Sequence, residues 1–199
     1  MAIITASNGY KLRPLADGDH TFMMETLKDF PIGNNTYKQR INEFSNMLYV
    51  TEQFNKTEVT NQSSVQAITM VLEKSDSTLV SFAHYRITNK VIEIRMGATH
   101  PSHRRQHHST AQLMLGGEFA YNHLGCTSSW QEIIDNDELN AAANPWRPSL
   151  SASETQRDSE NRLGDKETVT LNKVVATAAE HEAYRAAHST WGSITYTVS

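Results

Sequence analysis

Residues Ile94–Leu115 read IRMGATHPSHRRQHHSTAQLML and join a β-rich run to a helix-prone run. The β-rich run ends at Thr99, and Pro101 prevents its continuation as a central strand. Residues 101–109 are polar and basic, which predicts a loop. A helix is then expected over about 109–124, with Gly125 in the position that ends many helices. The stretch therefore predicts a strand–loop–helix junction.

The physical chemistry of such a junction favours an anion. The first backbone amides of a helix lack partners within the helix, and the helix dipole adds partial positive charge there. Arg104 and Arg105 would add charge-assisted hydrogen bonds. The loop is therefore predicted to bind a phosphate or pyrophosphate group.

On its N-terminal side, the junction follows three β-rich runs over residues 64–73, 78–87 and 90–99. Their short connections predict an antiparallel meander. Earlier residues predict a strand over 10–15, which Pro14 confines to an edge or an end. Two helices are expected, over residues 20–30 and 36–54. Asp17 or Asp19 would cap the first helix. The apolar faces of the two helices are predicted to contain Phe22, Met23, Leu27, Phe30, Tyr37, Ile41, Phe44, Met47 and Leu48.

On its C-terminal side, residues 127–134 predict another strand. Residues 135–167 contain two prolines, many serines and mixed charges, which are typical of a long loop or a partly disordered insertion. A strand is expected over 169–175, a helix over 176–188 and a final strand over 191–198. We interpret residues 1–199 as one domain carrying this insertion.

Composition excludes several classes of protein. The chain has 199 residues, of which 38% are hydrophobic, and a formal net charge of −4, which argues against nucleic-acid binding driven by bulk charge. A single cysteine, Cys126, excludes an intramolecular disulfide framework. No apolar run is long enough to span a bilayer and the N-terminus has no signal-peptide pattern, so we expect a cytoplasmic protein without membrane contact.

The order of elements, together with residues 94–115, resembles the GNAT superfamily of acyl-CoA-dependent N-acyltransferases. In that family, a loop of the type [Gln/Arg]-x-x-Gly-x-[Gly/Ala] opens a helix. Pro101 and Arg104 occupy the family's proline and Gln/Arg positions, whereas His107 and Ser109 stand where small residues are usual. The resemblance implies an α/β (α+β) fold with a mixed, mostly antiparallel central sheet flanked by helices. It also implies acetyl-CoA as co-substrate, an amine acceptor of unknown identity and a homo-oligomer as one assembly state.

The resemblance assigns roles to particular residues. Glu93 is the acidic residue of the strand before the loop and the candidate general base, with His84 as a second candidate and a merely structural role as the alternative for each. Tyr184 and His188 are candidates for the general acid, with core packing as the alternative for Tyr184. Asn140 and residues 141–143 also resemble the family's helix, and if they correspond to it, the C-terminal elements are shifted by one relative to the family. The expected coenzyme A contacts are Met96, Gly97, Ala98, Thr99, Arg104, Arg105, Gln106, His107, His108, Ser109 and Thr110.

Four of the nine histidines fall within His100–His108, and this cluster has three interpretations. A metal site is disfavoured because two arginines lie inside the cluster and no cysteine or carboxylate joins it. Anion binding, with affinity that rises as the histidines become protonated, is the interpretation we adopt. A solvated polar loop is the remaining alternative. We therefore predict no metal.

Two functions from different classes remain open. The first is an N-acetyltransferase that uses acetyl-CoA. The second is a catalytically degenerate GNAT-fold protein with a structural or interaction role, as in diverged phage members of which some are associated with the virion. The discriminating feature is whether the His107 and Ser109 positions still admit a pyrophosphate.

Overall fold

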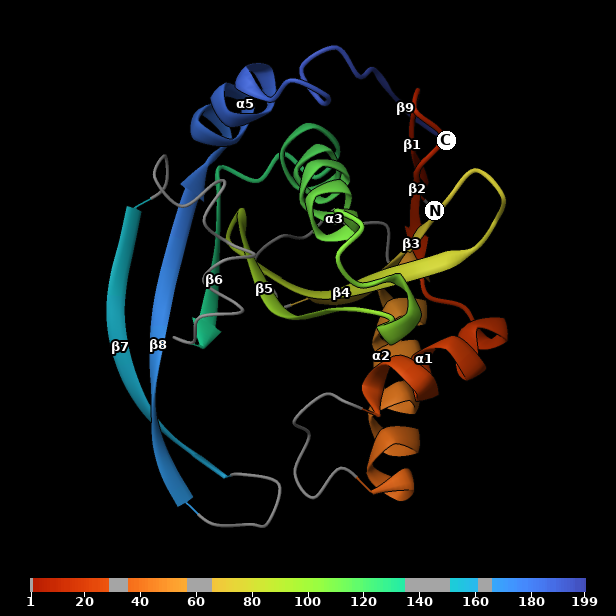
Figure 1. Cartoon of the computed structure of the whole chain (residues 1–199), viewed down its shortest axis with the longest axis vertical. Helices are drawn as coiled ribbons and strands as arrows, with labels where there is room; N and C mark the ends of the chain where they lie inside the picture. Colours follow the sequence, from red (N-terminus) through yellow and green to blue (C-terminus); the bar gives the residue numbers. More distant parts are fainter. Residues whose placement is uncertain (1, 29–35, 57–65, 135–150, 161–165) are drawn as a thin grey trace.

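The computed structural model describes residues 2–28, 36–56, 66–134, 151–160 and 166–199. One nine-stranded sheet runs through these residues in the order β7-β8-β6-β5-β4-β3-β2-β1-β9. In Figure 1, α1 and α2 lie on one side of β3–β5 and α3 lies on the other. This is the mixed, mostly antiparallel sheet flanked by helices that the sequence predicts. In the described part of the chain, no helix combines the length and apolar character needed to cross a bilayer.

The predicted meander is confirmed. Its strands are β3 (Gln66–Glu73), β4 (Leu79–Thr88) and β5 (Val91–Thr99), and each pairs antiparallel with the next. The register of the last pair is interrupted, because Tyr85 lies opposite Ile94 whereas His84 lies opposite Met96. Arg95 is therefore an extra residue in β5, and this β-bulge bends the strand locally. No sequence signal marks it.

The predicted strand after the α3 region is also confirmed, as β6 (Ser128–Ile134), which runs parallel to β5. Beyond it, β8 (Lys166–Thr177) pairs antiparallel with both β6 and β7 (Ser151–Glu160). Residues 151–160 thus form a strand, which corrects the expectation of loop or disorder there. Residues 135–150 and 161–165, which include Asn140, lie outside the described residues.

The N-terminal region contains one strand that the sequence prediction missed, β1 (Ile4–Ala6), beside β2 (Lys11–Pro14). Pro14 is the last residue of β2, as expected from its missing amide. The helices are α1 (His20–Leu27) and α2 (Tyr37–Lys56). The predicted extension of α1 to Phe30 lies outside the described residues. Asp19 is the N-cap residue of α1, as predicted, but its side chain forms no cap hydrogen bond to the helix.

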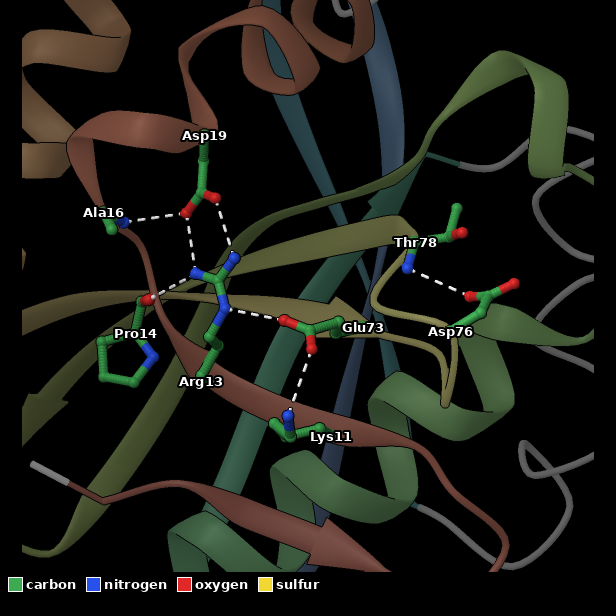
Figure 2. Close-up of polar contacts among 8 residues, drawn as sticks. All are labelled: Lys11, Arg13, Pro14, Ala16, Asp19, Glu73, Asp76 and Thr78. Carbon is green, nitrogen blue, oxygen red and sulfur yellow. Dashed lines mark hydrogen bonds and ion pairs between the residues drawn. The ribbon is translucent and has the colours of Figure 1, made fainter.

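Asp19 instead belongs to a charged network that fixes the junction of β2 and α1 (Figure 2). Arg13 donates from both terminal nitrogens to the Asp19 carboxylate, at 2.9 and 2.8 Å, and from Nε to Glu73 at 2.9 Å. Lys11 donates to the other oxygen of Glu73 at 3.2 Å. The amide of Ala16 donates to Asp19 at 2.8 Å. Both carboxylates are buried, and each is compensated by a cation.

Apolar side chains fill both faces of the sheet. On the face of α1 and α2, a cluster joins both helices to β3 and β4; it contains Leu15, Met23, Leu27, Phe44, Met47, Val71 and Phe82. On the other face, a larger cluster joins α3 (His108–Gly117) and a π-helical turn (Glu118–His123) to the strands; its members include Ile68, Ile87, Ile92, Met114, Leu115 and Phe119. The prediction of Tyr37 as a core residue is wrong, because its side chain is 59% exposed.

The C-terminal part packs α5 (Ala178–Ala187) against α3 and returns to the sheet as β9 (Tyr196–Val198). The contact explains a glycine inside α3. A Cβ on Gly117 would lie 2.1 Å from the ring of His181, so only glycine allows α5 this close approach. Gly125 has φ +66° and ends the helical segment, as predicted.

Candidate active site

The candidate site begins where β5 and β6 separate. Their parallel ladder has four pairs and ends at Ile94 opposite Gln131. β5 continues to Thr99 with β4 as its partner, whereas β6 continues to Ile134 with β8 as its partner. Among the described residues, the β6-facing edge of Met96, Gly97, Ala98 and Thr99 has no strand partner. The predicted backbone contacts therefore lie along an open strand edge, where alternate residues present free amides and carbonyls.

The bulge at Arg95 coincides with the end of that ladder. Glu93, two residues earlier, lies opposite Arg86 of β4 and accepts from Arg95 at 3.0 Å; its carboxylate also lies 3.8 Å from Arg86. Ile92 and Ile94 belong to the core beneath α3, so Glu93 faces the side of α1 and α2. The Glu93 side chain is only 10% exposed, whereas those of Arg86 and Arg95 are 46% and 51% exposed.

His84 lies on the same face as Arg86, opposite Met96. Its Nδ1 lies 2.8 Å from the hydroxyl of Thr69, a residue of β3 whose amide donates to the Thr51 hydroxyl of α2. Burial, and then the positive charge of Arg95, lower the pKa of His84 to about 4. The imidazole is therefore neutral at pH 7, and its low pKa makes it a weak base.

At the other end of the open edge, the predicted loop leads into α3. His107 precedes the helix with φ 61° and ψ 19°, a left-handed conformation that glycine adopts without strain. The His107 side chain forms no cap hydrogen bond to the helix. Within the described part of the chain, the amides of Gln106, His107, His108 and Ser109 donate to no other residue. The loop thus presents successive backbone donors, although His107 stands at the glycine position.

Both arginines of the loop are exposed. Arg104 donates from Nε to the carbonyl of Thr99 at 3.4 Å, so it lies beside the open edge of β5. Arg105 has φ 63° and follows it directly. Ser109 and Thr110 are within the first turn of α3, and His107 is the N-cap residue.

The four histidines of the cluster have different surroundings. Nδ1 of His100 bonds Ser102, and Nε2 bonds Glu25 of α1 at 3.0 Å. The ring of His103 lies between those of His100 and His108. His108 is buried, and its Nδ1 lies 2.9 Å from the Tyr10 hydroxyl. The side chain of His108 therefore faces the core, whereas its backbone amide lies at the start of α3.

Burial and neighbouring positive charge lower the pKa of two of these rings. Burial first, and then His103 and Lys74, lower the pKa of His108; burial and then His100 and Lys74 lower that of His103. Among the residues that the structure describes, no group of three or more His, Cys, Asp or Glu is arranged to hold a metal ion.

Tyr184 and His188 do not join Glu93. Tyr184 lies on α5 and packs against the core cluster on the α3 face, and its hydroxyl is buried without a hydrogen-bond partner among the described residues. Nδ1 of His188 accepts from the amides of Thr190 and Trp191 and fixes the turn after α5. Since Glu93 faces the opposite side of the sheet, the structure does not bring the three predicted catalytic side chains together.

Two features of the site escaped sequence reasoning. Arg86 reaches Glu93 only because β4 and β5 pair in this register, and Tyr10 reaches His108 across 98 residues of chain. Alternation along β4 could have placed Arg86 on the face of His84, but the partner residue depends on the register. No local pattern in the sequence pairs Tyr10 with His108.

Comparison of sequences finds no matching family model and no matching curated protein. Comparison of structures does find matches, each covering 87% of this chain. Spermidine N-acetyltransferase from Vibrio cholerae in complex with CoA and spermine matches at TM-score 0.58 and 12% identity over 98% of its chain. A dodecameric structure of spermidine N-acetyltransferase from the same organism, in an intermediate state, matches at TM-score 0.59 and 14% identity over 96% of its chain. SpeG from the same organism with manganese ions matches at 0.60 and 12% over 95%. With the separated β5 and β6 and the loop before α3, these matches show that the chain has the fold of the GNAT N-acetyltransferases.

Proposed function

We propose that the protein is an N-acetyltransferase that moves an acetyl group from acetyl-CoA to an amine. The observation that carries this proposal is the continuity of the open β5 edge with the unpartnered amides before α3. From Arg95 to Thr99 the strand spans about 13 Å at ~3.3 Å per residue. The site therefore suits an elongated ligand with an anionic end at α3 and a reactive end at the bulge.

The anionic end would be the pyrophosphate of coenzyme A. The amides of residues 106–109 and the dipole of α3 favour a phosphate group, and Arg104 and Arg105 add charge. Alternate residues of Met96–Thr99 would bond the extended arm of the ligand as a neighbouring strand would. These are the contacts expected from the resemblance, with the side chain of His108 excepted.

The reactive end lies beside Glu93. In acyl transfer the amine nitrogen attacks the thioester carbon, loses a proton, and the C–S bond of the tetrahedral intermediate breaks to release a thiolate. Glu93, directly or through water, would take the proton from the amine and return it to the sulfur. Backbone amides at the bulge would stabilise the oxyanion.

Tyr184 would act as the general acid only if α5 moved, because its hydroxyl is buried. His188 could act as the general acid only if it broke its hydrogen bonds to the amides of Thr190 and Trp191. Tyr184→Phe tests the first role: unchanged turnover would assign the proton of the thiolate to Glu93 or water.

Known acceptors of similar folds define the first assays. One structural neighbour is a complex with CoA and spermine, so spermidine and spermine are the first acceptors to test. Another is dodecameric, so we propose that this chain also assembles into a homo-oligomer, measurable by light scattering.

Calorimetry with coenzyme A tests the proposal directly. We expect binding, and Arg104→Ala should weaken it by ~1.5–3 kcal/mol, the worth of a charge-assisted hydrogen bond. Lys38→Ala, which removes a charge from the exposed start of α2, is the matched control. No heat at millimolar coenzyme A would contradict the proposal.

The left-handed His107 supports one alternative, a GNAT-fold protein that no longer binds coenzyme A. A side chain at the point of closest approach obstructs a pyrophosphate, and glycine would not. Such a protein would have a structural or interaction role, and virion association is one form of it. Absence of coenzyme A binding in the wild type and its appearance in His107→Gly would favour this alternative.

A further inference from the structure

The reactive end of the site carries an excess of positive charge. Glu93 is a single carboxylate, and two guanidinium groups share it: Arg95 at 3.0 Å and Arg86 at 3.8 Å. His84, the remaining titratable group on this stretch of β4, is neutral at pH 7. The described side chains at the bulge therefore sum to one net positive charge.

On the neighbouring strand, the described side chain in register with Glu93 adds no charge. Glu93 is in register with Trp130 on β6, which carries no charge.

The two arginines are also placed to meet a ligand. Their side chains are about half exposed, whereas the carboxylate between them is nearly buried. Glu93 thus occupies only part of the donor capacity of the two guanidinium groups, each of which carries five N–H donors. The remaining donors face the solvent on the side of α1 and α2.

That side is also where an acceptor would arrive. The opposite face at this position is filled by Ile92 and Ile94, which pack into the core beneath α3. An amine must therefore approach the end of the β5–β6 ladder from the face that carries Arg86, Arg95 and Glu93. A polycation on this path would meet like charge, whereas an anionic group would meet two fork-shaped donors.

We propose that the acceptor is a primary amine that also bears an anionic group, a carboxylate or a phosphate, held by Arg95 and Arg86. This inference rests on the proposed acetyl transfer and names its substrate class. It separates this chain from its polyamine-acetylating structural neighbours, whose acceptors carry only positive charge.

Paired acceptors that differ by the anionic group test the proposal. Thiol release from acetyl-CoA is measured with lysine against cadaverine, which is lysine without its carboxylate, and with phosphoethanolamine against ethanolamine. We expect kcat/KM to favour the anionic member of at least one pair by about tenfold or more, as a charge-assisted contact gives. The pair that shows the preference identifies carboxylate or phosphate.

Variants assign the preference to the arginines. Arg95→Gln should reduce it about fivefold or more, and Arg86→Gln with Arg95→Gln should abolish it. Lys90→Gln is the matched control, because it removes one positive charge from the exposed turn at the other end of β5. The control should keep the preference within about twofold, since surface charges at that distance are largely screened.

The outcomes separate two failures. Three results with a protein that binds coenzyme A would overturn the inference: equal turnover within both pairs, no turnover within both pairs, or faster turnover of cadaverine and spermidine. The proposed acetyl transfer would then still stand, with other amines as acceptors. A preference that Arg95→Gln and the double variant leave intact also overturns it. Absence of coenzyme A binding overturns the proposed function itself, and the inference with it.

Discussion

The junction of β2 with α1 and the junction of β5 with α3, taken from the bulge at Arg95 to the start of the helix, both gather charged side chains, but they treat polar groups in opposite ways. At the first, Arg13 and Lys11 compensate two buried carboxylates, and Arg13 forms hydrogen bonds to Asp19, Glu73 and a backbone carbonyl. At the second, two half-exposed arginines share Glu93, four amides lack partners among the described residues, and His107 is left-handed. Compensated groups stabilise a fold; uncompensated groups are available to a ligand.

The compensated junction is broken most severely by Arg13→Met. This variant leaves Asp19 and Glu73 buried without their main cation, which we expect to lower the free energy of unfolding by about 3–5 kcal/mol. Urea titration measures the change. Lys11→Met, which removes the more exposed cation, should cost below about 1 kcal/mol. A loss below 1 kcal/mol for both variants would show that the network is not a scaffold.

Glu93→Gln tests the uncompensated junction. Loss of a general base lowers turnover by about 100-fold or more. The dissociation constant of coenzyme A should be unchanged, because Glu93 lies at the far end of the open edge from α3. Steady-state kinetics and calorimetry on the same preparation check both numbers. An unchanged kcat would remove Glu93 from the mechanism.

His107→Gly asks whether the uncompensated junction also stores backbone strain. A left-handed residue with a side chain costs roughly 1 kcal/mol relative to glycine. We therefore expect the variant to be more stable by about that amount and to bind coenzyme A more tightly. Ser77→Gly, at a left-handed position in the β3–β4 turn, controls for the backbone effect alone. Tighter binding in both variants would argue against a specific role for position 107.

The smallest expected effect is on the pH dependence of stability. Burial would raise the pKa of Glu73, but hydrogen bonds from Arg13 and Lys11 outweigh it and hold the pKa below 4.5. A carboxylate with a lowered pKa stabilises the fold above pH 4.5, and this contribution is lost as the pH falls through the lowered pKa. Arg13→Met should flatten the acid limb of the unfolding curve below pH 4.5. If stability falls equally steeply with decreasing pH in the variant and in the wild type, Glu73 does not contribute to this pH dependence.

Local patterns predicted most of the scaffold. Residues 64–99 alternate between β-rich runs and tight turns, and they fold into β3, β4 and β5 as expected, because neighbouring strands joined by short turns pair with each other. Residues 151–160 were predicted to be loop or disordered because they are polar throughout. They form β7 by pairing with β8, so the partner strand overrides the weak local preference.

The site was predictable where its residues are close in sequence. The loop of residues 100–109 and the helix after it follow from proline, arginine and helix-end rules. The general acid was not predictable in the same way. Tyr184 and Glu93 are 91 positions apart, and strand order decides that they occupy opposite faces of the sheet.

By itself, the sequence determined the meander, the basic loop before α3 and the absence of a cysteine framework, because each depends on residues within one turn or one hairpin. The tertiary structure decided the end of the β5–β6 ladder, the bulge at Arg95 and the meeting of Arg86 with Glu93. These depend on register between strands, and a shift of one residue would reverse the face of every side chain. The net positive charge at the reactive end is therefore a property of the assembled sheet.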